Sequence, residues 1–154
     1  MLDKLNGKYA TRASTGPHKR LECIPLGILL KNRLHYAIDA KECMTIVRDK
    51  EGMIKVDHKI RRDPRYPLGM MDVVSIDKTS QHFRMLIDTK GRFQAHEIDD
   101  KEANFKLCKV IRKAMGRNKV PYIVTHDGRT IRYPHPEVKK HDSIKVSCTS
   151  SLSL

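Results

Sequence analysis

Aromatic residues are scarce in this sequence, which has three Phe, five Tyr and no Trp among 154 residues. Proteins that bind unpaired bases by stacking need aromatic rings, so this binding mode is disfavoured. Long apolar runs are lacking as well, and the longest, Ile24 to Leu30, is far too short to span a bilayer. We therefore expect no membrane partner, and recognition of a partner through its backbone and shape.

Metal-binding and redox motifs are also missing. Cys23, Cys43, Cys108 and Cys148 stand alone, without the short paired spacing of a zinc site or a redox motif. The His residues are scattered, and no pair has the spacing of metal ligands on a helix. Residues 1–8 lack the cationic start and apolar middle of a secretion signal, which favours a reducing, cytoplasmic compartment. We expect no metal, no other cofactor and no small-molecule substrate.

Positive charge is what the chain has in excess. Its 31 Lys and Arg outnumber 18 Asp and Glu, giving a formal charge of +13. Such a field favours a polyanionic partner, and nucleic acid is the first candidate. A hydrophobic content of 39% is enough for a modest folded core.

The first half of the chain predicts an arm, two short helices and a small sheet. Residues 1–22 are basic and lack periodicity, which is typical of an extended arm. Leucines at three- and four-residue steps predict a helix over 25–37, and Asp39 with Glu42 has the spacing of a capping box for a second helix through Val47. Strands are then predicted at 53–56, 59–62 and 72–76, with a turn at 57–58 and an elbow at 67–69.

The second half predicts mainly strands. A hairpin is expected from alternation over 82–88 and 92–98, and a helical turn over 100–104. Residues 105–115 suit a helix or a strand, and the flanking strands favour a strand. The Asp127-Gly128 pair predicts a hairpin between strands 122–125 and 129–133, and a last strand is expected over 143–147. Residues 148–154 have no charge or pattern and are expected to be disordered.

Several short sequence motifs are similar to those of a known family. Two short helices, a strand, a turn, a basic strand, an elbow and a last strand follow the order of the S-four RNA-binding domain, which residues 23–78 resemble. Six further words occur in order: MLDKL at 1–5, STGPHK at 14–19, YP with MDV at 66–73, DTKGRF at 88–93, KLCKV at 106–110 and VTHDGRTIRYP at 124–134. Together they resemble the eukaryotic and archaeal type of the small-subunit ribosomal protein S-four family.

This resemblance implies an α+β fold in which an S-four-type RNA-binding module, two short helices plus a small sheet, precedes a mostly antiparallel β central domain. The expected division is an N-terminal arm (1–22), the RNA-binding domain (23–78), the β-rich domain (79–148) and a tail (149–154). Family members usually carry a basic leader before the position of Met1 and a barrel with a KOW motif after the central domain. The resemblance therefore predicts a copy that is shortened at both ends.

The resemblance further implies a structural, non-enzymatic constituent of the small ribosomal subunit, a ribonucleoprotein that acts in translation. Its partners would be the rRNA of the small subunit and neighbouring ribosomal proteins. Its location would be the cytoplasmic ribosome, and the nucleolus during assembly in a eukaryote.

The candidate RNA-binding residues are the cations of the arm, the two helices and the basic hairpin, because rigid elements can hold charges against successive phosphates. They are His18, Lys19, Arg20, Lys31, Arg33, Lys41, Lys59, Arg61, Arg62 and Arg65. Arg can grip a phosphate with two parallel donors, which favours Arg61 and Arg62, although alternation places these two on opposite sides. Cations of the second half, Lys90, Arg92, Arg129 and Arg132, could instead keep the sheet soluble and protect its edges.

Two alternatives remain open at this point. One is a shortened RNA-binding paralogue that works outside the ribosome. The other is an RNA-modifying enzyme, because S-four modules occur in pseudouridine synthases with a catalytic Asp in a Gly-Arg-Leu-Asp word. The nearest string here is Gly91-Arg92-Phe93-Gln94, and Gln94 cannot act as the carboxylate.

Overall fold

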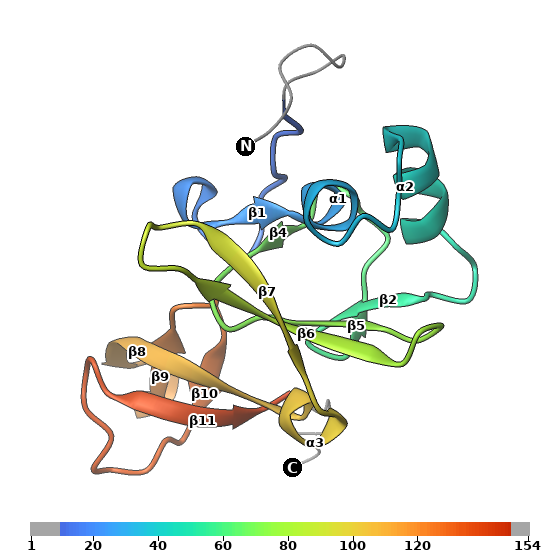
Figure 1. Cartoon of the computed structure of the whole chain (residues 1–154). Coiled ribbons are helices and arrows are strands. Elements are labelled where there is room, and N and C mark those ends of the chain that lie inside the picture. Colours follow the sequence, from blue (N-terminus) through green and yellow to red (C-terminus); the bar gives the residue numbers. More distant parts are fainter. Residues whose placement is uncertain (1–9, 149–154) are drawn as a thin grey trace.

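Short helices and antiparallel strands alternate through residues 10–148, the part of the chain that the computed structural model describes (Figure 1). The predicted α+β class is confirmed. The expected tail at 149–154 and the start of the arm at 1–9 lie outside the described residues. The helices are η1 (Arg20–Glu22), α1 (Leu26–Ile28), η2 (Leu29–Arg33), α2 (Ala40–Val47), α3 (Asp100–Ala103) and η3 (Arg117–Lys119). The strands are β1 (Ile24–Pro25), β2 (Ile54–Val56), β3 (Lys59–Ile60), β4 (Pro67–Leu68), β5 (Val73–Ile76), β6 (Gln81–Ile87), β7 (Phe93–Ile98), β8 (Phe105–Met115), β9 (Pro121–Thr125), β10 (Thr130–Arg132) and β11 (Ser143–Ser147).

The first helix is shorter than predicted. The helix expected over 25–37 ends at Arg33, and its last turns, η2, are wound as a π-helix in which the Leu34 amide donates to the Leu29 carbonyl at 2.9 Å. His35 follows with a left-handed φ of 56°, which stops helical propagation. Periodicity located the apolar stripe correctly, but it could not reveal this backbone reversal.

The second helix, α2, ends at Val47 as predicted. The capping interaction at its start is displaced by one residue. The Glu42 carboxylate accepts a hydrogen bond from the Ile38 amide at 2.8 Å, whereas the Asp39 side chain makes no capping bond.

The basic hairpin forms around a two-residue turn in which Asp57 and His58 both have positive φ, 50° and 59°. This is the backbone geometry that fits the twist of a two-residue hairpin. Its outgoing strand β3 is only two residues long, so Arg61 and Arg62 lie beyond it. The predicted elbow contains strand β4, which pairs with β1 in a small separate sheet.

Five strands form the main sheet in the order β3-β2-β5-β6-β7, and all neighbours are antiparallel. Helices α1 and α2 cover one face of it (Figure 1). The core lies between them and includes Leu26, Leu29 and Val47 from the helices with Val74 and Met85 from the strands. Burial of these apolar side chains holds the helices on the sheet.

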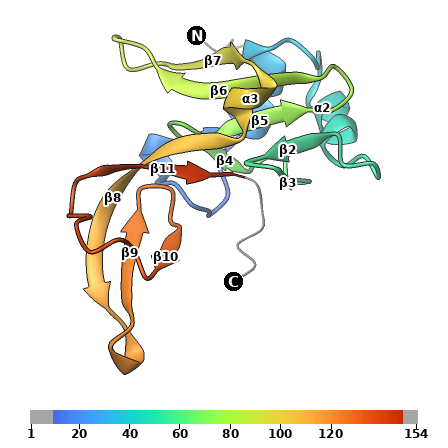
Figure 2. The same cartoon turned by 90° about the horizontal axis from the view of Figure 1, so that it is seen from below.

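A second sheet of four antiparallel strands has the order β10-β9-β8-β11. It lies on the side of the main sheet opposite the helices (Figure 1), and its β8–β9 hairpin projects away from the rest of the molecule (Figure 2). Strand β8 covers 105–115, so the strand prediction for this ambiguous segment is confirmed. The domain boundary expected between residues 78 and 79 falls between β5 and β6, which pair in the main sheet. The chain passes from the main sheet to the second sheet at α3, between β7 and β8.

A buried ionic cluster joins the two sheets and the arm. We use this name for Lys106, Arg129, His18 and the carboxylates of Asp57, Asp72 and Asp127. The Lys106 side chain is 1% exposed, and its Nζ lies 2.6 Å from Asp57 Oδ2, 3.0 Å from Asp72 Oδ1 and 2.8 Å from Asp127 Oδ2. An ammonium group has three donors, so each of them meets one carboxylate.

The rest of the cluster completes the hydrogen bonding of these carboxylates. Arg129 donates from Nη2 to Asp57 at 2.8 Å and from Nε to Asp127 at 2.9 Å. His18 Nε2 lies 2.7 Å from Asp72 Oδ2, which also accepts from the Gly69 amide at 3.0 Å. Buried charges are tolerated only with such pairing, so the cluster fixes how the parts of the chain meet.

The environment of the cluster shifts the pKa values of Asp72, Asp127 and Lys106 toward their charged forms. Burial alone would raise the pKa of Asp72, but the hydrogen bond with His18 and the charge of Lys106 outweigh it and hold that pKa below its usual value. Burial would likewise raise the pKa of Asp127, yet hydrogen bonds from Lys106 and Thr125 lower it. For Lys106, burial opposes the charge, but the attraction of Asp72 and Asp57 raises its pKa above the ordinary range.

Replacing Lys106 by Met should destabilise the fold strongly. The change leaves the buried carboxylates without their central cation, and breaking such a pair costs about 3–5 kcal/mol in free energy of unfolding. Urea unfolding measures this loss. The matched control is Lys109→Met on the exposed side of the same strand, which should stay within about 0.5 kcal/mol of the parent. Equal stability of the two variants would contradict the assigned role of Lys106.

The cluster also predicts how stability depends on pH. The folded-state pKa values of Asp72 and Asp127 lie below the unfolded value of about 3.9, so their contribution is present above that pH and disappears as the pH falls further. The folded-state pKa of Lys106 is raised, so its contribution is complete below about pH 10 and is lost at higher pH. Urea midpoints should fall on both the acid and the alkaline side. The acid fall should be shallower in Asp127→Asn, and an equally steep fall in that variant would argue against this account.

Candidate nucleic-acid interface

Most of the cations predicted to bind RNA lie at the surface. They belong to the arm, the first two helices, β3 and the loop that follows it. Seven are exposed: Lys19, Arg20, Arg33, Lys41, Lys59, Arg62 and Arg65. Lys31 and Arg61 are partly buried, and the His18 side chain is buried. RNA contact by these residues stays a prediction.

A groove between the arm and the first helix brings two of the predicted residues together. It encloses about 490 Å³, and its lining includes residues 10–13, Arg20, Ile28, Arg33 and Phe93. We call it the arm groove. Three guanidinium-bearing residues line it, Arg12, Arg20 and Arg33, and no Asp or Glu of residues 10–148 does. A hollow lined by positive charges and no negative ones has a strong positive potential, which suits the binding of a phosphate group.

Arg12 is the member of this groove that sequence reasoning missed. The arm has no periodicity, so nothing in it indicated which of its cations would face the helix. The structure shows what holds this segment in place. Arg65 Nε donates to the Arg12 carbonyl at 3.0 Å, and the Ser14 amide donates to the Arg65 carbonyl at 2.9 Å. Arg65 thus anchors the arm beside the groove.

Arg61 and Arg62 occupy different environments. The guanidinium carbon of Arg61 lies 4.5 Å from the centroid of the Tyr66 ring, and its buried Nε has no hydrogen-bond partner in the described part of the chain. Arg62 is exposed, and its Nη2 donates to the Lys50 carbonyl at 3.3 Å. Of the two, Arg62 is therefore the one at the surface, while Arg61 contributes a cation–π contact within the fold.

His18 does not lie on the surface, contrary to our expectation for an RNA-binding residue. Its side chain is 4% exposed and is bonded to Asp72 in the ionic cluster. A Cβ at position 69 would lie 2.2 Å from His18 Nδ1, so only Gly69 leaves room for the ring. Close packing against Gly69 and Asp72 gives His18 the role of fastening the arm to the main sheet.

Negative charge gathers at the other end of β7. A cavity of about 720 Å³ there is lined by His82 and His96 together with five carboxylates. These are Asp77, Glu97, Asp99, Asp100 and Glu102. Phe93, the first residue of β7, lines the arm groove, whereas His96 to Ile98 at the end of β7 line the acidic cavity. The two ends of β7 therefore carry opposite charge. An RNA backbone would be attracted to the arm groove and repelled from the acidic cavity.

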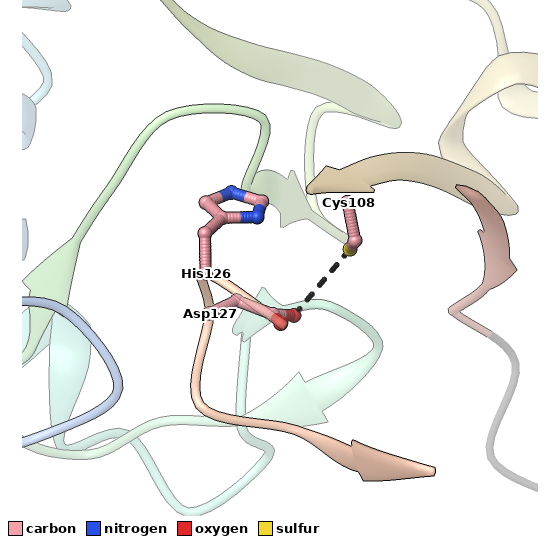
Figure 3. A group of neighbouring side chains, drawn as sticks. All are labelled: Cys108, His126 and Asp127. Atoms are coloured by element: carbon pink, nitrogen blue, oxygen red, sulfur yellow. Dashed lines mark hydrogen bonds between the residues drawn. The ribbon is translucent and has the colours of Figure 1, made fainter. Parts of the chain in front are cut away.

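Cys108, His126 and Asp127 are the one group of possible metal ligands within residues 10–148 (Figure 3). Their donor atoms are already engaged. Asp127 Oδ2 binds both Lys106 and Arg129, while His126 Nδ1 accepts from the Lys109 amide at 3.2 Å and Nε2 donates to the Met70 carbonyl at 3.1 Å.

The thiol of this group is poorly suited to a metal as well. Burial, followed by the charge of Asp127, raises the pKa of Cys108 to about 12, whereas a metal ligand must be a thiolate. The Cys108 Sγ instead donates to Asp127 at 3.7 Å. We therefore interpret the three residues as part of the packing around the ionic cluster.

Comparison with known proteins gives consistent matches. Residues 79–151 match the sequence model of "Ribosomal family S4e". The chain is 58% identical to the small ribosomal subunit protein eS4 of Bombyx mori and 56% identical to that of Tetrahymena thermophila, in each case over 98% of its length. The crystal structure of the 30S ribosomal protein S4e from Thermoplasma acidophilum covers 84% of this chain with a TM-score of 0.70 and 26% identity. That alignment takes in 65% of the archaeal chain.

The sequence and the fold thus agree, and the chain belongs to ribosomal family S4e. The resemblance inferred from the short sequence words is confirmed. The chain spans about 57% of the Bombyx mori protein and 58% of a second relative, so it corresponds to little more than half of these proteins.

Among residues 10–148, no helix has the length and apolar character needed to cross a membrane.

Proposed function

We propose that this chain is a structural constituent of the small ribosomal subunit that binds its rRNA through a basic surface. The observation that carries the proposal is the identity of 58% to a small ribosomal subunit protein over nearly the whole chain. The proposal includes neighbouring ribosomal proteins as partners and the cytoplasmic ribosome as the location, with the nucleolus as the site of assembly in a eukaryote. It assigns the chain no catalytic step.

The surface proposed to bind rRNA is centred on the arm groove. Arg20 and Arg33 have no ion-pair partner among the described residues, so both guanidinium groups are free to bind phosphate. They come from η1 and η2, and η2 packs on the main sheet through Leu29 and Leu30. Cations held on such a support lose little side-chain freedom on binding, which favours multiple phosphate contacts.

Two other functions compete with this proposal. An RNA-binding paralogue outside the ribosome would use the same basic surface and differs only in where the chain resides. An RNA-modifying enzyme would need a carboxylate at the position of Gln94, which is an exposed residue of β7 with no acidic group. The identity to ribosomal proteins favours the ribosomal role over both.

Sedimentation tests the ribosomal role. A tagged chain expressed in cells should co-migrate with small subunits in a sucrose gradient and remain there after a high-salt wash, because contacts with neighbouring ribosomal proteins hold it when salt weakens the phosphate contacts. An unrelated protein of similar size and charge is the control. Recovery of the chain only in the light fractions would refute the ribosomal role and support the free paralogue.

Reversing the charges of the arm groove should weaken RNA binding. In Arg20→Glu combined with Arg33→Glu, the log–log dependence of affinity on salt should become shallower by about two units, roughly one for each lost phosphate contact. Filter binding to deproteinised small-subunit rRNA at several salt concentrations measures this slope. Both residues are exposed, so the circular dichroism spectrum should not change.

The matched control is Lys78→Glu combined with Lys101→Glu, which alters the net charge by the same amount. These two exposed lysines adjoin Asp77 and Asp100 of the acidic cavity, where an RNA backbone is not expected. The control should keep the slope of the parent chain. Equal losses in the two double variants would mean that the overall charge, and not the arm groove, determines binding.

A further inference from the structure

One face of the four-stranded sheet is open and carries cations. Along β8, Lys106, Cys108 and Val110 are buried, whereas the alternate residues Leu107 and Lys109 are exposed. Successive side chains of a strand point to opposite faces, so this alternation separates an inner face from an outer one. An irregularity between Val110 and Arg112 shifts the register, after which the outer face continues through residue 112.

Strand pairing identifies the other residues of this outer face. Lys109 pairs with Ser143, Arg112 with Val124, and Val124 in turn with Thr130. Two more cations, Lys145 and Arg132, share this face, because directly paired residues lie on the same side of a sheet. Lys145 pairs with Leu107. Arg132 pairs with Tyr122, which in turn pairs with Ala114. We call the surface formed by Lys109, Arg112, Arg132 and Lys145 the sheet face.

No negative charge balances the sheet face from within its own sheet. The four strands β8, β9, β10 and β11 contain no Asp or Glu at all. The side chains of Lys109, Arg112 and Arg132 have no ion-pair or hydrogen-bond partner among the described residues. Within residues 10–148, Lys145 is engaged only with the Phe105 ring, whose centroid lies 3.9 Å from its Nζ.

Protection of sheet edges does not explain the central cation of this surface, Lys109, although Arg132 and Lys145 lie on the edge strands β10 and β11. Lysine is often placed on edge strands to prevent pairing with another chain. Lys109, however, lies inside the sheet, since its strand is paired with β11 through Ser143 and its carbonyl accepts from the His126 amide at 3.0 Å. A cation at such a central position has no edge to protect, so a partner outside the chain is the better explanation.

The chemistry of the sheet face fits the backbone of an RNA helix. Its cations can meet phosphates, while the two aromatic residues within its strands offer little free ring surface, because Phe105 is covered by Lys145 and Tyr122 is half-buried. Double-stranded RNA is recognised mainly through its shape, phosphates and 2′-hydroxyl groups. The sheet face lies on the sheet below the main sheet, whereas the arm groove adjoins the helices above it (Figure 1). The two basic surfaces therefore belong to opposite sides of the main sheet.

We propose that the sheet face binds the phosphate backbone of a second RNA helix, so that one chain bridges two helices. This inference rests on the proposed rRNA-binding function and adds a second contact surface to it. Lys109 and Arg112 are the residues that contact this second helix.

The bridge can be tested by energy transfer between two RNA hairpins. Each has a stem of roughly 16 base pairs, the length that a double-stranded RNA-binding domain spans, and the two carry a donor and an acceptor dye. With the full chain at half the total RNA concentration, the acceptor emission should rise. It should fall again at excess protein, when each hairpin has a chain of its own.

The variant Lys109→Glu combined with Arg112→Glu should still bind one hairpin but lose the energy transfer. Lys78→Glu combined with Lys101→Glu, which alters the charge equally, should keep both. Circular dichroism checks that each variant is folded.

Unchanged transfer in the Lys109/Arg112 variant would mean that the second hairpin binds elsewhere on the chain, and would overturn the sheet face as the second contact surface. Binding of a single hairpin without transfer by the parent chain would also overturn it, while the proposed function would stand. If the parent chain binds neither hairpin nor small-subunit rRNA, the proposed function fails together with this inference.

Discussion

A lysine ammonium that has almost no contact with water determines how this molecule is put together. Lys106 on β8 meets Asp57 from the turn of the basic hairpin, Asp72 before β5 and Asp127 from the β9–β10 turn. A charge in this position is stable only while all three partners are present, so the four-stranded sheet cannot slide or tilt on the main sheet without exposing unpaired charge. Through His18, the same cluster reaches the arm.

The sequence predicted the local elements well, because each depends on neighbours within about ten residues. Helix α2 and the hairpins around 57–58, 89–91 and 126–128 were expected from capping, alternation and turn residues, and they are present. Three features were not predicted, because they depend on contacts distant in sequence. They are the π-helical turns that end at Arg33, the pairing of β1 with β4, and the continuation of the main sheet past residue 78. The buried Lys106 left a partial signal, since alternation places it on the same face as Cys108 and Val110, but the sequence indicates Asp57 and Asp127 only as residues of turns.

For the candidate interface, the sequence predicted which residues are charged but not what each charge touches. Arg61 and His18 have the same chemistry as a phosphate-binding residue, yet one lies over Tyr66 and the other binds Asp72. Arg12 was not singled out, although the fold places it beside Arg20 and Arg33. A cation becomes available to RNA only if the fold offers it no carboxylate or ring, and this is decided by tertiary packing.

The order in which the cluster residues occur along the chain has a consequence for biosynthesis. Asp57 and Asp72 are made 49 and 34 residues before Lys106, and Arg129 comes 72 residues after Asp57. While the polypeptide is growing, the amino-terminal part therefore has acidic groups whose counter-charge has not yet been translated. Because those groups must stay hydrated until then, the nascent segment can collapse around its helices, but the surface that carries Asp57 and Asp72 closes only after Lys106 and Arg129 have left the exit tunnel.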